Sequence, residues 1–175
     1  TIAQVVRDTI ILEFAPTLVC IVLAGVAGSR IASELGNMRV SEQIDALEIM
    51  GVKTKTYLIL PKILAALLMI PLLVVIAMTL GIWGGRLAGV SSGIISGQEF
   101  DAGLKLFFDP FTVKFALIKS YVFAFIISSI AAFYGYYVKG GALEIGRAST
   151  KAVVVSCILI LFADYVLSAL LLKAN

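Results

Sequence analysis

The amino-acid sequence predicts an all-α fold, a polytopic bundle of transmembrane helices that forms a single domain over residues 1–175. Composition is the first reason: 61% of the residues are hydrophobic and 14% are charged, whereas soluble domains are about half apolar and about a quarter charged. The second reason is that four stretches reach the roughly 20 apolar residues needed to cross a hydrocarbon core. The third is that no stretch alternates as the strands of a membrane barrel do.

We expect the four membrane-spanning helices at residues 9–28, 63–90, 113–138 and 151–173. Helices are expected because backbone groups in lipid must find their hydrogen bonds within the segment itself or in a closed barrel. The chain starts with Thr1, and no basic segment precedes the first apolar run. The sequence therefore looks like the later part of a longer protein rather than one with a signal peptide.

Basic residues predict the orientation of these helices. The loop from 29 to 62 carries five lysines and arginines, and the loop from 139 to 150 carries Lys139 and Arg147. The loop from 91 to 112 holds only Lys105. Because cytoplasmic loops carry the excess of lysine and arginine, the first and third loops are expected in the cytoplasm, and the second loop and the C-terminus outside.

Residues 97–109 are expected to form a short helix lying on the outer, periplasmic membrane surface. Apolar residues recur there at steps of three or four, as surface helices require. They are Phe100, Leu104, Phe107 and Phe108, followed by Phe111. The pair Asp109-Pro110 is expected to end this helix.

Residues 40–51 predict a second short helix, on the cytoplasmic side. Ser41 is a good N-cap and Gly51 a good C-terminal stop. An apolar stripe contains Val40, Ile44, Leu47 and Met50, and an acidic stripe contains Glu42, Asp45 and Glu48. A helix that binds a membrane surface normally carries lysine or arginine. Carboxylates therefore favour a protein partner, and a solvated face is the alternative.

Several kinds of chemistry find no support in the sequence. Histidine is absent, and Cys20 and Cys157 fall inside apolar spans without paired spacing, which is typical of buried small hydrophobes. The carboxylates show no metal-ligand spacing, so no metal site is expected. No Lys-Ser or Lys-Thr pair has the upstream glycines of a P-loop.

Two ridges of small residues recur every fourth position, so that each lies along one helix face. The first contains Ala24, Gly28, Ala32 and Gly36, and the second contains Ala77, Gly81, Gly85 and Gly89. Such ridges allow close approach of another helix backbone. The spacing favours packing within the chain and leaves a subunit interface open.

Charged residues inside the spans require a partner or a wet cavity. Lys119 and Asp164 lie at depths of roughly 9 and 13 Å from the outer face, taking 1.5 Å per residue. We interpret them as a structural ion pair, with a proton relay as the alternative. Glu13 has two possible placements, in a cavity or at the outer interface.

A longer pattern resembles a known family. The segment "GSRIASELGNMRVSEQIDALEIMGV", followed by "LPKILA" and "GIWGG", resembles the MlaE-type permeases, the membrane subunits of ABC transporters that move phospholipids. The likeness runs from about residue 12 to the C-terminus and includes "LIKSYVFAF" and "ADYVLSALL". Family members are longer at the N-terminus, so the chain resembles a five-helix permease that lacks its first part.

The resemblance implies that residues 40–51 form the coupling helix of a bacterial inner-membrane transporter. The expected contact residues for a separate cytoplasmic ATPase are Glu42, Gln43, Asp45, Ala46 and Leu47. That ATPase would hold ATP and Mg, with no cofactor and no catalytic residue in this chain. The other implied partners are a second permease copy, a periplasmic MCE-domain protein and phospholipid, without nucleic acid.

A lipid cavity between the two copies is also implied, with Glu13, Arg30 and Glu34 as candidate lining residues. Many members carry an arginine just after the glycine at Gly25, whereas this chain has Val26. Two further functional hypotheses remain: a proton-coupled secondary carrier that uses Glu13 or Asp164, and a structural membrane anchor of a larger complex. A carrier would favour two related halves with broken helices, and the sequence shows no internal repeat.

Overall fold

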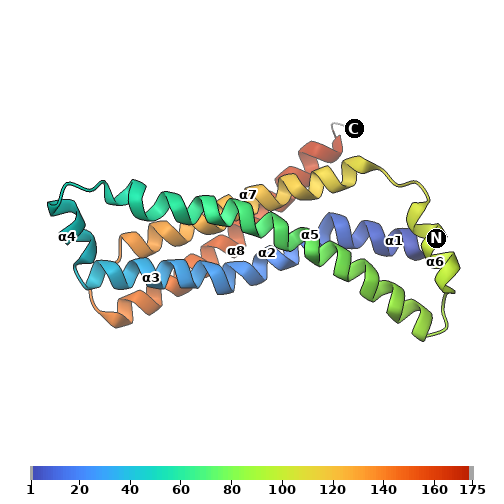
Figure 1. The fold of residues 1–175 in the computed structure, drawn as a ribbon, viewed down its shortest axis with the longest axis horizontal. Helices are drawn as coiled ribbons and strands as arrows, with labels where there is room; N and C mark the ends of the chain where they lie inside the picture. Colours follow the sequence, from blue (N-terminus) through green and yellow to red (C-terminus); the bar gives the residue numbers. More distant parts are fainter. Residues whose placement is uncertain (1, 174–175) are drawn as a thin grey trace.

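The structure, a computed structural model, describes residues 2–173, and over this range it is built from helices without strands (Figure 1). Four helices are long and apolar enough to cross a membrane: Ile2–Val40, Lys55–Ser91, Pro110–Tyr136 and Ala142–Leu171. The predicted all-α polytopic bundle is therefore confirmed.

The first long helix is a continuous rod of five consecutive segments. They are α1 (Ile2–Thr9), η1 (Ile10–Leu18), α2 (Val19–Leu23), η2 (Ala24–Gly28) and α3 (Ser29–Val40). The two η segments are π-helical. The rod extends beyond the expected range 9–28 at both ends, because its polar flanking turns continue the helix past the length that lipid alone requires.

The other long helices also exceed their apolar cores. The segment η3 (Lys55–Ile59) continues into α5 (Leu60–Ser91), and α7 (Pro110–Tyr136) and α8 (Ala142–Lys173) complete the bundle. Two short helices, α4 (Gln43–Ile49) and α6 (Gly97–Lys105), lie at opposite ends of it (Figure 1). The chain therefore runs along the length of the bundle four times, once in each long helix.

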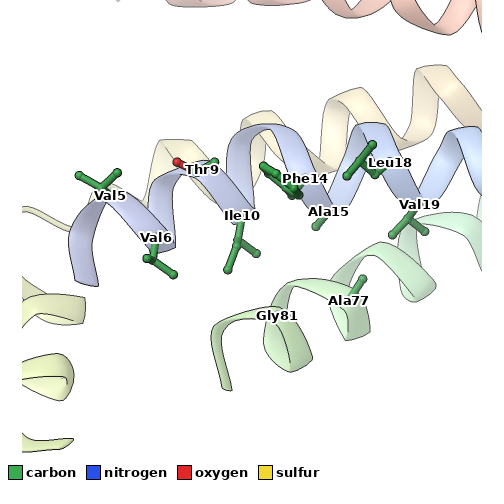
Figure 2. A pocket seen from close by; sticks show the side chains of 10 residues that line it. All are labelled: Val5, Val6, Thr9, Ile10, Phe14, Ala15, Leu18, Val19, Ala77 and Gly81. Carbon is green, nitrogen blue, oxygen red and sulfur yellow. The ribbon is translucent and has the colours of Figure 1, made fainter. Parts of the chain in front are cut away.

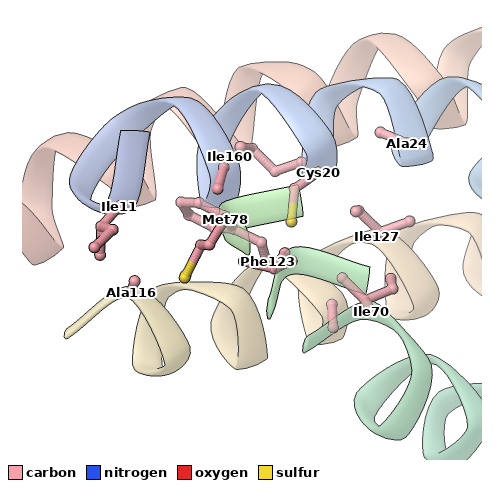
Figure 3. Close-up of a cluster of buried hydrophobic side chains, with 12 residues drawn as sticks. Ile11, Cys20, Ala24, Ile70, Met78, Ala116, Phe123, Ile127 and Ile160 are labelled. Atoms are coloured by element: carbon pink, nitrogen blue, oxygen red, sulfur yellow. The ribbon is translucent and has the colours of Figure 1, made fainter. Parts of the chain in front are cut away.

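Helix α7 lies at the centre of the bundle, in contact with α3, α5 and α8. In its most apolar stretch 56% of the residues are buried inside the chain, against 11% for α8. The main core cluster joins residues of all four long helices, including Cys20, Val74, Phe123 and Ile160 (Figure 3). Helix α8 therefore keeps most of its apolar surface for lipid or for another protein.

The small-residue ridges face other helices of the same chain. A Cβ atom built on Gly81 would lie 3.0 Å from Ile10, and one on Gly85 would lie 3.0 Å from Val6. On the same ridge, a Cβ atom on Gly89 would lie 3.1 Å from Ile95, and on the first ridge one on Gly28 would lie 3.6 Å from Ile127. Side chains of the same chain therefore pack against both ridges.

The tightest approach occurs at a glycine outside both ridges. A Cβ atom on Gly135 in α7 would lie 2.5 Å from the carbonyl oxygen of Ala32 and 2.9 Å from its Cα atom. Since Ala32 belongs to the first ridge, the small residues of α3 and α7 meet backbone to backbone. Only a residue without a side chain fits at this crossing.

Helix α6 is fixed at its start and in its middle. Ser96 and Glu99 form a reciprocal capping box at its start, and Arg86 of α5 pairs with Asp101 at 2.8 Å. The helix ends at Lys105, four residues before the expected Asp109, because Asp109 instead caps α7 through its side chain. Phe107 and Phe108 therefore lie in the connection and not on the predicted helix face.

Candidate functional site

A cluster of charged side chains lies inside the bundle, around the ammonium group of Lys119. Its Nζ atom is 2.5 Å from Asp164 Oδ1 and 3.1 Å from Glu13 Oε1. Lys119 is fully buried, whereas the side chains of Asp164 and Glu13 are 18% and 49% exposed. The structure thus brings the expected pair together and adds Glu13, whose placement the sequence left open, as a second carboxylate.

The π-helical segment η1 shapes this cluster. Pro16 has no backbone N–H, so it cannot donate a hydrogen bond to the carbonyl of Leu12, four residues earlier. Lys119 Nζ donates to that carbonyl at 3.0 Å. Thr17, in the same segment, donates to Asp164 Oδ1 at 3.2 Å. Segment η1 therefore presents a backbone carbonyl acceptor and a side-chain hydroxyl donor to the charged groups of the cluster.

The cluster holds one lysine against two carboxylates, so it carries an excess of one negative charge when all three groups are ionised. Lys119 Nζ has four oxygen atoms within hydrogen-bond distance, two of them on carboxylates and the most distant being Ser168 Oγ at 3.5 Å. Asp164 receives a further hydrogen bond from Thr17. Glu13 is the most exposed of the three, which makes it the group that water or a ligand can reach.

The three candidate lipid-cavity residues do not lie together. Arg30 and Glu34 line a hollow of about 570 Å³ with Asn37 of α3 and Ile145 of α8. Glu13 precedes Arg30 by 17 residues on one continuous rod, which separates them by roughly 25 Å at 1.5 Å per residue. Glu34 also pairs with Lys62 at 2.8 Å. These residues therefore belong to two different regions of the bundle.

A larger and more apolar groove, of about 620 Å³, runs between the first helix and α5 (Figure 2). Phe14 and Leu18 line one side of it, and Ala77 and Gly81 line the other. The missing side chain at Gly81 opens the groove where Ile10 approaches. Because almost all of its lining side chains are apolar, the groove is suited to bind a hydrocarbon chain such as a lipid tail.

Helix α4 occupies the end of the bundle opposite α6 (Figure 1). Four of the five expected contact residues, Glu42, Gln43, Asp45 and Ala46, are exposed, and Leu47 is half-buried. Ile44 is fully buried against the chain. All five side chains are therefore at least partly accessible to a partner, whereas Ile44 packs inside the chain.

The helix begins differently from the prediction. Ser41 is the residue that ends α3, where its hydroxyl donates to the carbonyl of Asn37 at 2.7 Å, so its assignment as the N-cap of α4 is wrong. Glu42 stands at that position with φ 61° and makes no side-chain cap. The reason is that α3 continues to Val40, which leaves only a tight two-residue turn before α4.

The end of α4 follows the predicted pattern. Gly51 has φ 79°, its N–H donates to the carbonyl of Glu48 at 3.0 Å, and that of Val52 donates to Leu47 at 3.1 Å. This pair of bonds is the Schellman arrangement. It leaves Ile49 and Met50 on the last turn with 88% and 68% of their side chains exposed.

Buried polar contacts connect α4 to the end of α7. The hydroxyl of Tyr136 donates to Glu48 Oε1 at 3.1 Å and shares a 2.7 Å hydrogen bond with the hydroxyl of Thr54. Arg39 donates to the carbonyl of Tyr136 at 2.9 Å and to Asp45 Oδ1 at 2.9 Å. Asp45 and Glu48, two of the three residues of the acidic stripe, are thus engaged inside the chain.

Sequence reasoning missed Thr17, Arg39, Thr54 and Tyr136. Pro16, four residues after Leu12, was a usable signal for a freed carbonyl near Glu13. No comparable local signal marked Tyr136, because its partners are 82 and 88 residues away.

Comparison with known proteins identifies relatives along the whole chain. Residues 1–170 match the sequence model of a family described as Permease MlaE. A probable ABC transporter permease protein of Rickettsia bellii is 40% identical over 173 residues, which are 99% of this chain and 67% of the relative. The Arabidopsis thaliana protein TRIGALACTOSYLDIACYLGLYCEROL 1, chloroplastic, is 37% identical over 164 residues, 90% of this chain and 45% of the relative.

A further relative is the intermembrane phospholipid transport system permease protein MlaE of Haemophilus influenzae. It is 30% identical over 176 residues, which cover 100% of this chain and 67% of the relative. The chain therefore spans about two thirds of the length of these bacterial relatives. From the family match and the long alignments it follows that the chain belongs to the MlaE permease family.

Proposed function

We propose that this membrane permease moves phospholipids between the inner and outer membranes of a bacterium, as part of an ABC transporter in the inner membrane. Membership of the MlaE permease family supports the permease role. The name of the Haemophilus influenzae relative supports the phospholipid substrate. Energy would come from a separate cytoplasmic ATPase that holds ATP and Mg and docks on α4.

The observation that carries the docking proposal is the exposed last turn of α4. Ile49 and Met50 are 88% and 68% exposed at an end of the bundle that the basic loops place in the cytoplasm. Burial of such side chains by a partner removes apolar surface from water and is favourable. The exposed carboxylate of Glu42 adds a charge for basic groups of the ATPase.

The polar contacts that join Tyr136 to Glu48, Thr54 and Arg39, here called the clamp, support the same proposal. A helix that transmits motion must be attached firmly to the membrane part, and Glu48 and Asp45 attach α4 to α7 and α3. Docking energy can then be transferred to the long helices instead of only bending the loop. Asp45 therefore has an internal partner as well as the proposed external one.

The proposed assembly also contains a second permease copy and a periplasmic MCE-domain protein. Because the chain engages both glycine ridges itself, the second copy must use another face. Helix α8 is the candidate, because only 11% of its most apolar stretch is buried, the lowest share among the four long helices of the described chain.

The test is copurification of the ATPase from membranes that express both proteins. Ile49→Ser with Met50→Ser should leave the abundance of the permease unchanged and reduce recovery of the ATPase and ATP-dependent lipid movement. Ile94→Ser is the matched control, since Ile94 is 68% exposed at the opposite end. Asp45→Lys should also reduce recovery, and it additionally repels Arg39.

Full recovery of the ATPase with the Ile49→Ser and Met50→Ser variant would exclude α4 as the docking element. Lipid movement that persists without ATP and instead follows a proton gradient would favour the secondary carrier. Mass spectrometry of lipid that copurifies with the permease tests the substrate separately.

A further inference from the structure

The connection between α6 and α7 contains an unusual backbone conformation at Phe107. Its φ is 51°, and among the non-glycine residues that the structure describes only Glu42 shares a positive φ. Bulky residues rarely adopt this region. The Phe107 side chain is also 80% exposed. Strain and an apolar ring in water both oppose folding, so a contact that covers the exposed ring would stabilise this position.

Contacts from Arg7 hold the backbone that precedes Phe107 and the aromatic ring that follows it. Arg7 of α1 donates from Nη1 to the carbonyl of Leu104 at 2.6 Å and to that of Leu106 at 2.9 Å. Its Cζ atom lies 5.6 Å from the centre of the Phe108 ring. Arg7 is itself buried. The guanidinium therefore satisfies the last carbonyls of α6 and fixes the direction in which Phe107 points.

The position of the connection along the membrane normal follows from α7. Asp109 caps that helix at Phe111, and Pro110 is its first residue. The apolar run begins near residue 113, so Phe107 lies about two turns or less outside the hydrocarbon. This is the headgroup layer, where aromatic residues are enriched.

The flanking charges suit lipid phosphates. Lys105 and Lys114 are exposed, and within residues 2–173 neither forms a salt bridge. Leu106 and Phe108 flank Phe107 and expose 43% and 47% of their surface. The apolar tip thus lies between Lys105 and Asp109, with Lys114 in the second turn of α7, close to the start of a membrane-spanning helix.

We propose that residues 106–108 form a membrane wedge that inserts into the outer-facing leaflet, with the Phe107 ring at the boundary between headgroups and acyl chains. Lys105 and Lys114 contact the phosphates of that leaflet, and Arg7 fixes the tip. Lipid is favoured over a protein partner because the tip is continuous with a membrane span and has Lys105 and Lys114 nearby, while the neighbouring carboxylate of Asp109 is engaged as the cap of α7. The wedge depends on the membrane orientation and not on the transport proposal.

Fluorescence quenching in vesicles that contain only this permease tests the wedge. The chain has one tryptophan, Trp83, so the background is Trp83→Phe and the reporter is Phe107→Trp. Lipids brominated near the headgroup end of the acyl chains should quench this reporter roughly twice as strongly as lipids brominated near the methyl end. Aqueous iodide should quench it weakly. The matched control is Ile49→Trp in the same background, which iodide present on both sides of the vesicle membrane should reach, because Ile49 is 88% exposed.

Strong iodide quenching of the Phe107→Trp reporter without quenching by brominated lipid would overturn the wedge and leave the tip to a periplasmic protein. A second measurement uses natural residues. Phe107→Asn keeps a residue that tolerates positive φ but removes the ring. Trypsin added outside the vesicles should then cleave after Lys105 several times faster than in the wild type. Equal cleavage rates would also overturn the proposal.

Discussion

The hydroxyl of Tyr136, at the end of α7, donates a hydrogen bond of 3.1 Å to Glu48 Oε1 on α4, 88 residues away. Thr54 joins the same pair: its hydroxyl lies 2.7 Å from that of Tyr136 and 3.0 Å from Glu48 Oε1, and its single proton is donated to one of these two oxygens. Tyr136 and Thr54 are both buried. Helix α4 is therefore attached to the central helix of the bundle by a closed set of polar contacts.

Tyr136→Phe should lower the free energy of unfolding by about 1–3 kcal/mol, because it leaves buried polar partners without the hydroxyl. The ring contact with Arg39, at 4.5 Å from the ring centre, should survive. The measurement is thermal unfolding in detergent together with amide hydrogen exchange over α4, which should accelerate. Tyr57→Phe is the control, since Tyr57 is exposed. Unchanged exchange over α4 would contradict the clamp.

The charge cluster predicts that Lys119→Leu lowers the free energy of unfolding by about 3–5 kcal/mol, since it leaves buried carboxylates uncompensated. Asp164→Leu combined with Lys119→Leu should recover only part of this loss, because Glu13 remains. Adding Glu13→Gln should recover more. Unfolding titrations of the three variants provide the measurement.

The same cluster separates a structural role from a proton relay. A structural role predicts that Asp164→Asn reduces stability and transport together, since Asp164 lies 2.5 Å from Lys119 Nζ. Intact stability with abolished transport would instead support a relay or a substrate contact.

The helix crossing at Gly135 predicts opposite signs for two identical substitutions. Gly135→Ala should destabilise the fold by about 1–3 kcal/mol, because the new methyl group meets the Ala32 backbone. Gly84→Ala, with nothing within 4 Å of its Cβ position, should be neutral or stabilising by up to about 1 kcal/mol. Equal effects in thermal unfolding would show that the crossing is looser than described.

The second ridge predicts a result for oligomers. Gly85→Leu should separate α5 from Val6 of α1, at 3.0 Å, and so lower the stability of the single chain. The distribution of oligomers in detergent should stay unchanged. Dissociation of a dimer at unchanged unfolding temperature would assign the ridge to a subunit contact after all.

The capping of α6 predicts an acid dependence. Hydrogen bonds from the Ser96 backbone lower the pKa of Glu99, and the hydrogen bond from Arg86 lowers the pKa of Asp101. A carboxylate whose pKa is lowered on folding stabilises the fold above its unfolded pKa, about 4, and loses this effect as the pH falls through the lowered pKa. The unfolding temperatures of the wild type and of Glu99→Gln with Asp101→Asn should therefore converge in acid. A constant difference would contradict this assignment.

The sequence by itself determined the helical class, the four spans and both short helices, because apolar length and periodicity are local properties of a segment. It also determined the stop at Gly51, since a left-handed C-terminal residue is a local requirement that glycine meets. The pairing of Lys119 with Asp164 could be predicted from their depths alone.

Only the tertiary structure decided how the helices are rotated against one another. Rotation placed Glu13 beside Lys119, turned Gly85 toward Val6, and brought Tyr136 to Glu48. It also decided that α3 continues to Val40, which excludes Ser41 from capping α4. The physical reason is that span length fixes depth in the membrane, whereas the facing direction of each helix depends on packing between residues far apart in the chain.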